Sequence, residues 1–595
     1  MELKKVLSTA GVFSLAAGAM VSSGLFILPS VAFSEAGRGM ILSYLFAGLC
    51  MIPAVLTKLE LTSAIPKAGG AYFYLTRIFG APVGIVAGLA DWFSIAFKSA
   101  FALVGIGLFG SLLFPGFGPT EFKLVAVGAC LLFTALNLLS VKGTARFQVG
   151  MVAFLLVILV MYILVGYRRM EFTHYTGGPP LDPVKILTTT AMVFISYGGI
   201  TKVAAAVEEV KDLRRTLVPG FIGAFVVVQV LYLLVLFVTI GAMDREVLIT
   251  SYSPLTDAAA VFFTGGLIGS AARAAVAAAG LLAFFTTANA GILTASRVPL
   301  AMSRDGLLPG FLGEMSPKGT PRVAILATSG FMLAVIIALE VKELARVASL
   351  FLLLVFFLEN LGLLVIRASR ISTYRPVFRS PLFPVLQVSG VLVYGLLIAV
   401  QGALPLLIAA GFIAVAMLWY LAYARRGWSR TSAFISLIKK VSGPDFAEPG
   451  EDLEDELLEV LMQREDIQED RFDTLVKNAA VLDYDRTIDR DRFFADAGRL
   501  LAERRGLDPD KLAEKFRSRE EQSSTVIYPG VAVPHAIPHV VVEGELLFDL
   551  LLARARFGIR WSGDEVVYTA FAMIGSKDER TFHLQALMSI AQILQ

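Results

Sequence analysis

The sequence predicts two fold classes in one chain: an all-α membrane bundle of about twelve transmembrane helices, followed by a soluble α/β domain. The first rests on composition, because 56% of the 595 residues are hydrophobic, 17% are charged and the mean hydropathy is +0.72. Such a chain contains many apolar segments long enough to cross a bilayer. The second rests on a change after Lys440, where an acidic run from Glu448 to Glu456 precedes charged amphipathic segments that alternate with short apolar ones.

The predicted spans all end before Arg425. They are centred near residues 20, 50, 98, 130, 157, 195, 230, 283, 331, 356, 392 and 412. Lys4 and Lys5 precede the first one, but no clear signal-peptide cleavage site follows Pro29, so we interpret this segment as a span. An even number of spans puts both chain ends on one side. Lysine and arginine are more frequent in the segments on that side than in those on the other side, and Lys58 is counted among these loop residues. This bias predicts a plasma-membrane protein with both ends in the cytoplasm.

The first predicted span contains residues that interrupt a helix. From Gly18 to Pro29 the otherwise apolar run holds two glycines, two serines and a proline. In hydrocarbon, a peptide group that loses its helical hydrogen bond must be surrounded by protein or by a water-filled cavity. A broken span near the middle of the membrane therefore indicates a binding site.

A second interruption lies in the sixth predicted span, where glycines and polar residues again occupy mid-span at Phe194–Lys202. Two broken spans at corresponding positions are typical of an inverted repeat that holds a substrate between half-helices. The N-terminal end of a half-helix attracts an anion, and freed carbonyl groups attract an ammonium group or a metal cation. The alternative is that these glycines only allow close packing of helices.

Four motifs resemble those of the amino acid-polyamine-organocation (APC) superfamily of permeases, and they occur in the order found there. They are Gly18–Pro29 in the first span, Ile65–Tyr72 after the second, Phe194–Leu217 in and after the sixth, and Thr287–Pro309 in and after the eighth. The resemblance covers about residues 8–425. It implies a LeuT-like fold, in which two repeats of five helices are related by inversion.

The resemblance also implies a substrate site at the two breaks. The carboxylate of a substrate would meet backbone N–H groups at the first break, and its amine would meet carbonyl groups at the sixth-span break. The residues implied in substrate binding are Met20, Ser22, Ser23, Gly24, Phe194, Ile195, Tyr197 and Gly198. The first break contains no aspartate that would repel a carboxylate, which favours amino acids over polyamines as substrates.

The sequence leaves the coupling ion open between sodium and a proton. The fifth predicted span has no charged residue, so it lacks the lysine that replaces a sodium ion in some proton-coupled relatives. Thr286 and Thr287 carry hydroxyl groups suited to sodium, unless they bond to their own helix. Lys98 and Lys202 are costly charges within spans, so each is a candidate for carrying a proton. The alternative for Lys98 is a pairing with a carbonyl group or with Glu359.

Three of the four histidines of the chain lie in the C-terminal segment. His535 lies in a loop rich in glycine and proline, and His583 begins a predicted helix. Together with residues 519–527 they resemble the enzyme IIA domain of the fructose/mannitol branch of the phosphotransferase system, over about residues 455–595. The resemblance implies that His535 accepts a phosphoryl group and that His583 supports it. It departs from the family at Ala536, where glycine is usual.

The predicted organisation is a permease at residues 1–430, a linker at 431–454 and the enzyme IIA-like domain at 455–595, cut short or continuing beyond Gln595. The predicted elements of the last domain are helices around Leu453–Met462, Arg471–Val481 and Arg492–Glu503, and strands at Val540–Val542, Leu546–Ala553 and Val566–Ile574. A zinc site formed by His535, His539 and His583 would lack a completing cysteine or carboxylate, so no metal site is predicted. No other cofactor is expected.

These observations predict a secondary active transporter of an amino acid, regulated by its enzyme IIA-like domain, rather than an enzyme. Its expected partners are the amino acid, the lipid bilayer and a phosphocarrier protein, but no nucleic acid, and a homo-oligomer stays open. Two other classes also stay open: an inorganic cation transporter, for example of potassium, and a membrane-anchored histidine phosphotransferase. The C-terminal domain has a rival interpretation as a degenerate fold that binds a ligand or a partner subunit.

Overall fold

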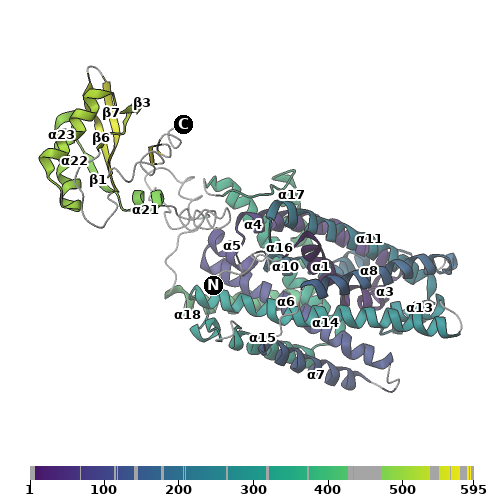
Figure 1. Ribbon diagram of the computed structural model, residues 1–595. Coiled ribbons are helices and arrows are strands. Elements are labelled where there is room, and N and C mark those ends of the chain that lie inside the picture. The colour runs from purple at the N-terminus through teal and green to yellow at the C-terminus, as the bar shows by residue number, and fades with distance from the viewer. Residues whose placement is uncertain are drawn as a thin grey trace. The chain divides into compact units, whose positions relative to one another are not determined.

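The chain divides into two compact units, Met1–Glu465 and Asp466–Gln595 (Figure 1). The structure is a computed structural model. It describes residues 7–67, 69–112, 116, 118–139, 145–175, 180–205, 207, 210–262, 266–316, 320–371, 374–426, 433, 471–536, 548–562, 565–575, 586–587 and 590. His583, His539, the segments 453–462 and 540–542 and nearly all of the predicted linker lie outside the described residues.

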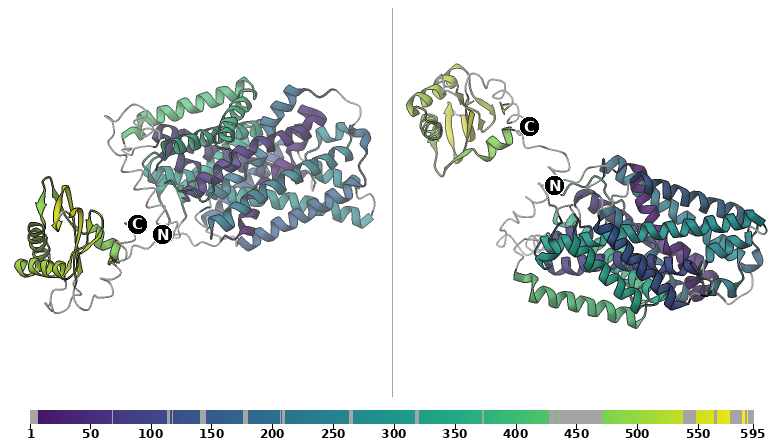
Figure 2. Two further views of the ribbon diagram at one scale, coloured as in Figure 1. Left: turned by 90° about the horizontal axis from the view of Figure 1, so that it is seen from above. Right: turned by 60° about the horizontal axis from the view of Figure 1, so that its bottom comes forward.

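The first unit is a bundle of long helices that run alongside one another (Figures 1 and 2). In its described part, nine segments are long and apolar enough to span a membrane. They are Leu28–Ala64, Ala81–Phe109, Pro119–Leu138, Gln148–Tyr167, Pro183–Ala204, Leu213–Ala242, Gly269–Arg304, Val341–Ser369 and Ala403–Ala422. Three shorter apolar helices are Thr9–Met20, Arg322–Ala338 and Val385–Ala399. A helix thus lies at each predicted position, and the predicted all-α membrane bundle is confirmed.

The individual helices of this unit follow the apolar runs of the sequence. The longer ones are α4 (Met40–Ala64), α6 (Ala81–Phe109), α7 (Pro119–Leu138), α8 (Ala145–Tyr167), α11 (Val218–Ala242), α14 (Gly266–Arg304), α15 (Arg322–Ala338), α16 (Val341–Ser369), α17 (Val385–Ala399) and α18 (Ala403–Ala422). The short ones are α5 (Ala71–Phe79), α12 (Arg245–Thr250), α13 (Pro254–Phe262), η1 (Gly37–Gly39), η2 (Gly110–Leu112), η3 (Phe172–Tyr175), η6 (Leu213–Leu217), η7 (Gly310–Gly313) and η8 (Ala424–Arg426).

The helices differ in how much of their surface other helices cover. In the most apolar 18-residue stretch of α6, 89% is buried inside the protein, whereas in that of α18 only 11% is buried. Many small residues along α6 allow its neighbours to approach closely, as is common at contacts between membrane helices. On α8, large apolar side chains such as Val157, Met161 and Leu164 are exposed. Such surfaces suit contact with lipid, so α6 lies at the centre of the bundle and α8 and α18 at its edge.

Both interruptions predicted from the sequence are present. The first span consists of α1 (Thr9–Met20), α2 (Ser23–Phe26) and α3 (Leu28–Ala36), and the chain leaves helical geometry at Ser22, with φ −138° and ψ −122°. The sixth span consists of α9 (Pro183–Val193), a 3-10 turn η4 (Phe194–Tyr197) and α10 (Ile200–Ala205). Each break therefore frees backbone groups inside the bundle.

The second unit contains a mixed sheet in the order β1-β6-β7-β4-β3, with β2 beside β6 and β5 beside β7. The strands are β1 (Ala480–Tyr484), β2 (Ile488–Asp489), β3 (Val526–Tyr528), β4 (Val531–Ala532), β5 (His535–Ala536), β6 (Phe548–Ser562) and β7 (Glu565–Gly575). The helices are α21 (Arg471–Lys477), α22 (Arg490–Arg505) and α23 (Pro509–Gln522). Neighbouring residues of β6 face opposite sides of the sheet, so Leu551 packs with α22 and α23 while Leu550 packs with Phe472 of α21. The predicted α/β class is confirmed.

Several elements of this unit differ from the prediction, which did not include the short strands β2, β3, β4 and β5. The helix predicted over Arg471–Val481 ends at Lys477, and Ala480–Tyr484 forms β1, which pairs in parallel with β6. Its alternation of half-buried and exposed residues has the period of a strand. The helix α23 was not predicted, although Asp508 caps it by accepting hydrogen bonds from two backbone N–H groups and Pro509 begins it.

Candidate functional site

The two broken spans meet directly. A Cβ atom on Gly24 would stand 2.6 Å from the Cβ of Ser196, and one on Gly199 would stand 2.5 Å from the backbone nitrogen of Met20. The hydroxyl oxygen of Tyr232 on α11 lies 2.8 Å from the carbonyl oxygen of Met20 and 3.2 Å from that of Ser196. Glycine at these two positions therefore allows the breaks to touch, and Tyr232 holds them together.

The residues predicted to bind substrate are gathered at this contact and are all buried. They are Met20, Ser22, Ser23, Gly24, Phe194, Ile195, Tyr197 and Gly198. The carbonyl group of Gly24 accepts a hydrogen bond from the Tyr44 hydroxyl at 2.7 Å. The hydroxyl group of Ser22 has no hydrogen-bond partner among the described residues. The first break thus contains a buried polar group that remains free to bind something else.

The carbonyl groups freed at the second break are already bonded to a lysine. Lys98 of α6 places its Nζ atom 2.9 Å from the carbonyl oxygen of Ile195 and 3.2 Å from that of Ser196. The N–H group of Ile195 donates to the hydroxyl of Ser349 at 3.0 Å. Lys98 is thus paired with carbonyl groups, as in the alternative to a proton-carrying role. The Ile195 carbonyl, which was expected to meet a substrate amine, accepts an ammonium group of the chain itself.

The other residues of the second break have packing roles. Phe194 packs its ring edgewise against aromatic rings of α16 and α17. The hydroxyl of Tyr197 donates to Oε1 of Gln229 on α11 at 2.6 Å. A Cβ atom on Gly198 would stand 3.1 Å from the side chain of Leu352. These contacts hold the backbone of the break in place.

A small cavity lies between the first, fifth, sixth and eighth spans. Its lining residues are Leu15, Gly18, Ala19, Gln148, Lys202, Thr286, Thr287 and Ala290. Lys202 donates from Nζ to the carbonyl oxygen of Thr287 at 2.9 Å, and the Thr286 hydroxyl donates to a carbonyl group of its own helix. The hydroxyl of Thr287 is buried and has no hydrogen-bond partner among the described residues, whereas its carbonyl group already accepts a positively charged group. The prediction that Thr286 and Thr287 bind sodium stays a prediction.

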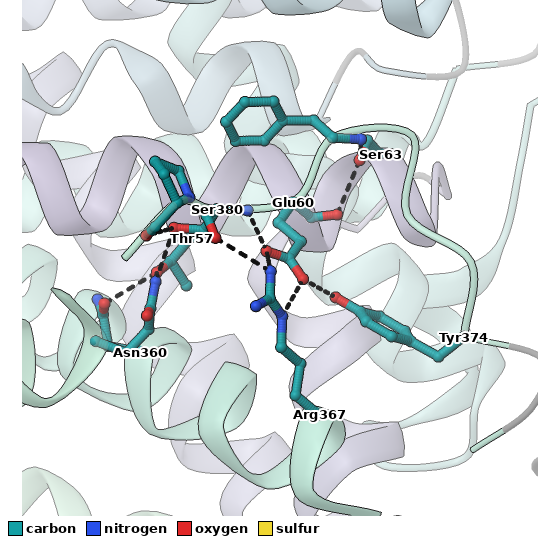
Figure 3. A network of polar contacts seen from close by, with 10 residues as sticks. Thr57, Glu60, Ser63, Asn360, Arg367, Tyr374 and Ser380 are labelled. Atoms are coloured by element: carbon teal, nitrogen blue, oxygen red, sulfur yellow. Dashed lines mark hydrogen bonds and ion pairs between the residues drawn. The ribbon is translucent and has the colours of Figure 1, made fainter. Parts of the chain in front are cut away.

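A network of polar contacts fastens the C-terminal end of α4 to α16 (Figure 3). The carboxylate of Glu60, which is fully buried, accepts two hydrogen bonds from Arg367, at 2.7 and 2.5 Å. It also accepts the N–H group of Ser380 at 2.6 Å and the hydroxyl of Tyr374 at 3.2 Å. Two parallel bonds between a guanidinium and a carboxylate are strong and directional. Glu60 therefore ties α4 both to α16 and to the segment after it.

A second ion pair links the same two helices, and it corrects two predictions. The Nζ atom of Lys58 lies 2.5 Å from Oε1 of Glu359, and both side chains are fully buried. Lys58 therefore lies inside a membrane helix rather than in a loop, and Glu359 pairs with Lys58 rather than with Lys98. Sequence reasoning did not select Lys58, Glu60 or Asp91, although a charged residue within an apolar helical run was the available signal.

In the second unit, His535 is oriented by three contacts. Its short strand β5 pairs with β7, opposite Met573. Its Nδ1 atom lies 3.1 Å from the carbonyl oxygen of Val533, which can only accept, so Nδ1 carries the proton. Nε2 is then the basic nitrogen, and it accepts a hydrogen bond from Nε of Arg519 at 3.0 Å. This tautomer presents a nucleophilic nitrogen beside a cation.

The surroundings of His535 favour its neutral form. Burial lowers its pKa below the ordinary value, and the positive charge of Arg519 lowers it further, while the Val533 carbonyl and Glu520 act in the opposite direction. Glu520 fixes the end of α23 by accepting from the backbone N–H of Thr525 at 2.9 Å and from Nε1 of Trp561 at 2.9 Å. The neighbouring Arg519 is thereby held next to the histidine.

Comparison with known proteins assigns both units. A model of the family described as amino acid permease matches residues 7–430. The chain belongs to the amino acid permease family. Residues 475–595 of the permease match the family described as phosphoenolpyruvate-dependent sugar phosphotransferase system, EIIA 2. Both resemblances predicted from the sequence are thereby confirmed, and the permease is a multi-pass membrane transporter.

Relatives of the permease carry names with different substrates. The methylthioribose transporter of Bacillus subtilis (strain 168) is 27% identical over 446 residues, which cover 71% of this chain and 94% of that protein. The branched-chain amino acid permease BcaP of Lactococcus lactis subsp. cremoris (strain MG1363) is 27% identical over 416 residues, 65% of this chain and 87% of that protein. Cationic amino acid transporter 1 of Arabidopsis thaliana is 26% identical over 383 residues, 62% of this chain and 63% of that protein.

Proposed function

We propose that the permease is a secondary active transporter that carries an amino acid across the plasma membrane by alternating access, with both chain ends in the cytoplasm. The observation that carries the proposal is the direct contact between the two broken spans at Gly24 and Ser196. The N–H groups of Ser23 and Gly24 bind the carboxylate of the substrate, next to the unpartnered Ser22 hydroxyl, while the Ser22 N–H group donates to the Met20 carbonyl at 2.8 Å.

Lys98 acts as a stand-in for the substrate amine. In the empty carrier its ammonium group holds the carbonyl groups of Ile195 and Ser196. A substrate amine displaces it, and Lys98 returns when the substrate leaves. This exchange keeps an ammonium group on the two carbonyl groups in both states, which matters because a hydrogen bond to a charged group contributes about 1.5–3 kcal/mol.

The coupling ion in this proposal is a proton, and sodium is not needed. Lys202 supports this assignment. Its ammonium group lies at the cavity lined by Thr286 and Thr287, so a positive charge of the chain itself occupies the place that a sodium ion would take. Lys202 and Lys98 also repel each other, so displacement of Lys98 by a substrate changes the field at Lys202.

Counterflow in proteoliposomes tests the transport proposal. Vesicles preloaded with each amino acid of a panel, and with methylthioribose for comparison, are diluted into the labelled compound. We expect labelled amino acid to accumulate with the wild type and with Gly150→Ala, whose added Cβ would meet nothing within 4 Å. We expect none with Gly24→Ala, whose added Cβ would collide with Ser196. Potassium flux without counterflow of any amino acid would overturn the proposal.

The C-terminal domain regulates transport by accepting a phosphoryl group on Nε2 of His535. The lone pair of Nε2 attacks phosphorus of a phosphohistidine on a phosphocarrier protein, the new N–P bond forms, and the N–P bond of the donor breaks. The support is the tautomer of His535, whose unprotonated Nε2 atom accepts a hydrogen bond from Arg519. The phosphoryl group adds about two negative charges, which alter how the domain docks and bias the transport equilibrium.

Transfer of labelled phosphate tests this part separately. Wild type and His174→Ala, a variant of a histidine in the membrane unit, should become labelled from a phosphorylated phosphocarrier protein, and His535→Ala should not. The uptake rate should then differ between phosphorylated and unphosphorylated wild type, and not in His535→Ala. An unlabelled wild type would instead favour a domain that binds a ligand or a partner subunit.

A further inference from the structure

Three charged side chains from three different helices meet inside the membrane unit. Lys58 of α4 and Glu359 of α16 form the fully buried ion pair described above. Asp91 of α6 is only 2% exposed and interacts electrostatically with both of them. Tyr74 of α5 donates its hydroxyl to Oε1 of Glu359 at 2.5 Å. The cluster therefore contains one cation and two carboxyl groups, all removed from water.

The hydrogen bonds distinguish the two carboxyl groups. Oε1 of Glu359 accepts from both Lys58 and Tyr74, which is the environment of an ionised carboxylate, while its Oε2 atom has no hydrogen-bond partner among the described residues. Asp91 accepts a hydrogen bond from the backbone N–H of Ala71 at the start of α5. Its Oδ1 atom is buried and has no hydrogen-bond partner among the described residues. Each carboxyl group thus has one unpartnered oxygen, but of the two only Glu359 bonds to the ammonium group of Lys58, so Asp91 is the carboxyl group with less to stabilise its charge.

The charge of the cluster indicates which ligand would bind there. With Lys58, Glu359 and Asp91 all ionised, the cluster would hold a net negative charge in a region that water does not reach, which is costly. One proton neutralises it. We propose that Asp91 binds the proton that drives transport, and this proposal rests on the amino acid transport proposed above. On uptake an O–H bond forms at Oδ1, and on release the proton returns to water on the other side of the membrane.

The groups that face Asp91 come from the elements packed around it. They are Lys58 from α4, Tyr74 from α5 and Glu359 from α16, while Arg77 of α5 pairs with Asp305 at 2.9 Å. Protonation weakens the attraction between Asp91 and Lys58 and the bond from the Ala71 N–H group. The start of α5 is then less firmly held to α6. Proton binding at Asp91 thereby biases the packing of α4, α5 and α6, which is what a coupling site must do.

The test separates proton coupling from transport itself. Purified full-length protein is reconstituted as wild type, Asp91→Asn, Asp91→Glu and Ser94→Ala, the last a buried polar residue one turn along the same helix. Two assays are run on each: counterflow at equal pH on both sides, and substrate accumulation driven by an inward proton gradient with a pH-sensitive dye inside. Infrared difference spectra between low and high pH report protonation of a carboxyl group without any substrate.

We expect Asp91→Asn to keep counterflow. Its gradient-driven accumulation of substrate should fall about tenfold, without proton entry. The remaining accumulation should not depend on pH. The carboxyl band of the infrared spectrum should be reduced in this variant. Asp91→Glu should restore part of the coupling, and Ser94→Ala should behave as wild type. Gradient-driven accumulation by Asp91→Asn at the wild-type level, or an unchanged carboxyl band, would overturn the proposal. Failure of wild-type counterflow would instead reject amino acid transport, and the infrared result would still decide whether Asp91 binds a proton.

Discussion

Five of the cationic side chains described above fall into two groups that differ in their partners. Lys58 and Arg367 each face a fully buried carboxylate. Lys98 and Lys202 face only backbone carbonyl groups, and Arg519 faces a neutral imidazole. In the first group the two charges cancel. In the second group a positive charge is left over, and it can meet an anion or give way to another cation.

The energies of the two kinds of contact follow this division. Removal of one member of a buried ion pair leaves an uncompensated charge and costs about 3–5 kcal/mol. A hydrogen bond between a charged and a neutral group contributes about 1.5–3 kcal/mol. We therefore expect the first group to hold the helices together. In the function proposed above, the second group lies where the chain binds and releases other molecules, so substitutions there should affect transport or phosphorylation more than folding.

The largest expected effect comes from Lys58→Met. The variant leaves Glu359 buried beside Asp91 without a cation, so we expect it to lose about 3 kcal/mol of stability. Thermal unfolding in detergent, followed by size-exclusion chromatography, measures this. The double variant Lys58→Met/Glu359→Met removes both charges and should recover most of the loss. A single variant as stable as the double variant would show that the pair does not hold α4 to α16.

Arg519→Ala should affect phosphorylation strongly and folding little. The guanidinium group donates, at 3.0 Å, to the nitrogen that would receive the phosphoryl group, so its loss should slow labelling of His535 by about 100-fold. The matched control is Arg517→Ala on the same helix, because Arg517 pairs with the exposed Asp491 at 3.4 Å. Equal labelling rates in the two variants would place Arg519 outside the phosphorylation site.

Lys98→Met separates exchange from net transport. A carrier loaded with an amino acid has the substrate amine on the Ile195 and Ser196 carbonyl groups, so counterflow should persist. The empty carrier of this variant loses the charge-assisted bond at both carbonyl groups, which keep neutral donors, the Gly198 N–H group and the Tyr232 hydroxyl. Its return should therefore slow net uptake by about tenfold. Parallel measurement of counterflow and of net efflux into unlabelled buffer tests this. An equal loss in both assays would mean that Lys98 has only a structural role.

The pH dependence of His535 labelling should reflect its shifted pKa. Because burial and Arg519 lower this pKa, the neutral nucleophile persists at pH values where an ordinary histidine, with a pKa of about 6.5, is already protonated. Labelling should therefore stay constant from pH 8 to below pH 6.5 and decline only in more acidic buffer. The residual rate of Arg519→Ala should decline at a higher pH, since one cause of the lowering is gone. A shift of its midpoint to lower pH would contradict this.

The sequence predicted the architecture well because the breaks are local. Glycine, serine and proline inside apolar runs interrupt a helix wherever the chain folds, so both breaks could be placed without knowledge of contacts. The IIA-like domain was recognised in the same way, from motifs around His535. The strand β1 was misassigned because a short apolar run carries little periodic signal, and the pairing with β6 decides its conformation.

The partners of the buried charges could not be predicted. Lys98 and Glu359 were both visible as charges in spans, but their pairing depends on how α4, α6 and α16 rotate about their axes. That rotation brings Glu359 to Lys58 and directs Lys98 to the carbonyl groups of the sixth span. The order of residues along a helix shows on which face of the helix a side chain lies. Which residue it contacts depends on how several helices pack together.

The smallest expected effect is the response to sodium. Because the ammonium group of Lys202 already bonds the Thr287 carbonyl, replacing sodium by choline should leave wild-type uptake unchanged at constant pH. Lys202→Ser removes the built-in cation and leaves hydroxyl and carbonyl oxygens facing the cavity, which are ligands that sodium accepts. We expect this variant to transport slowly and to gain a sodium response. If the wild type were stimulated by sodium, Lys202 would belong with the structural cations, and the distinction between the two groups would fail at this residue.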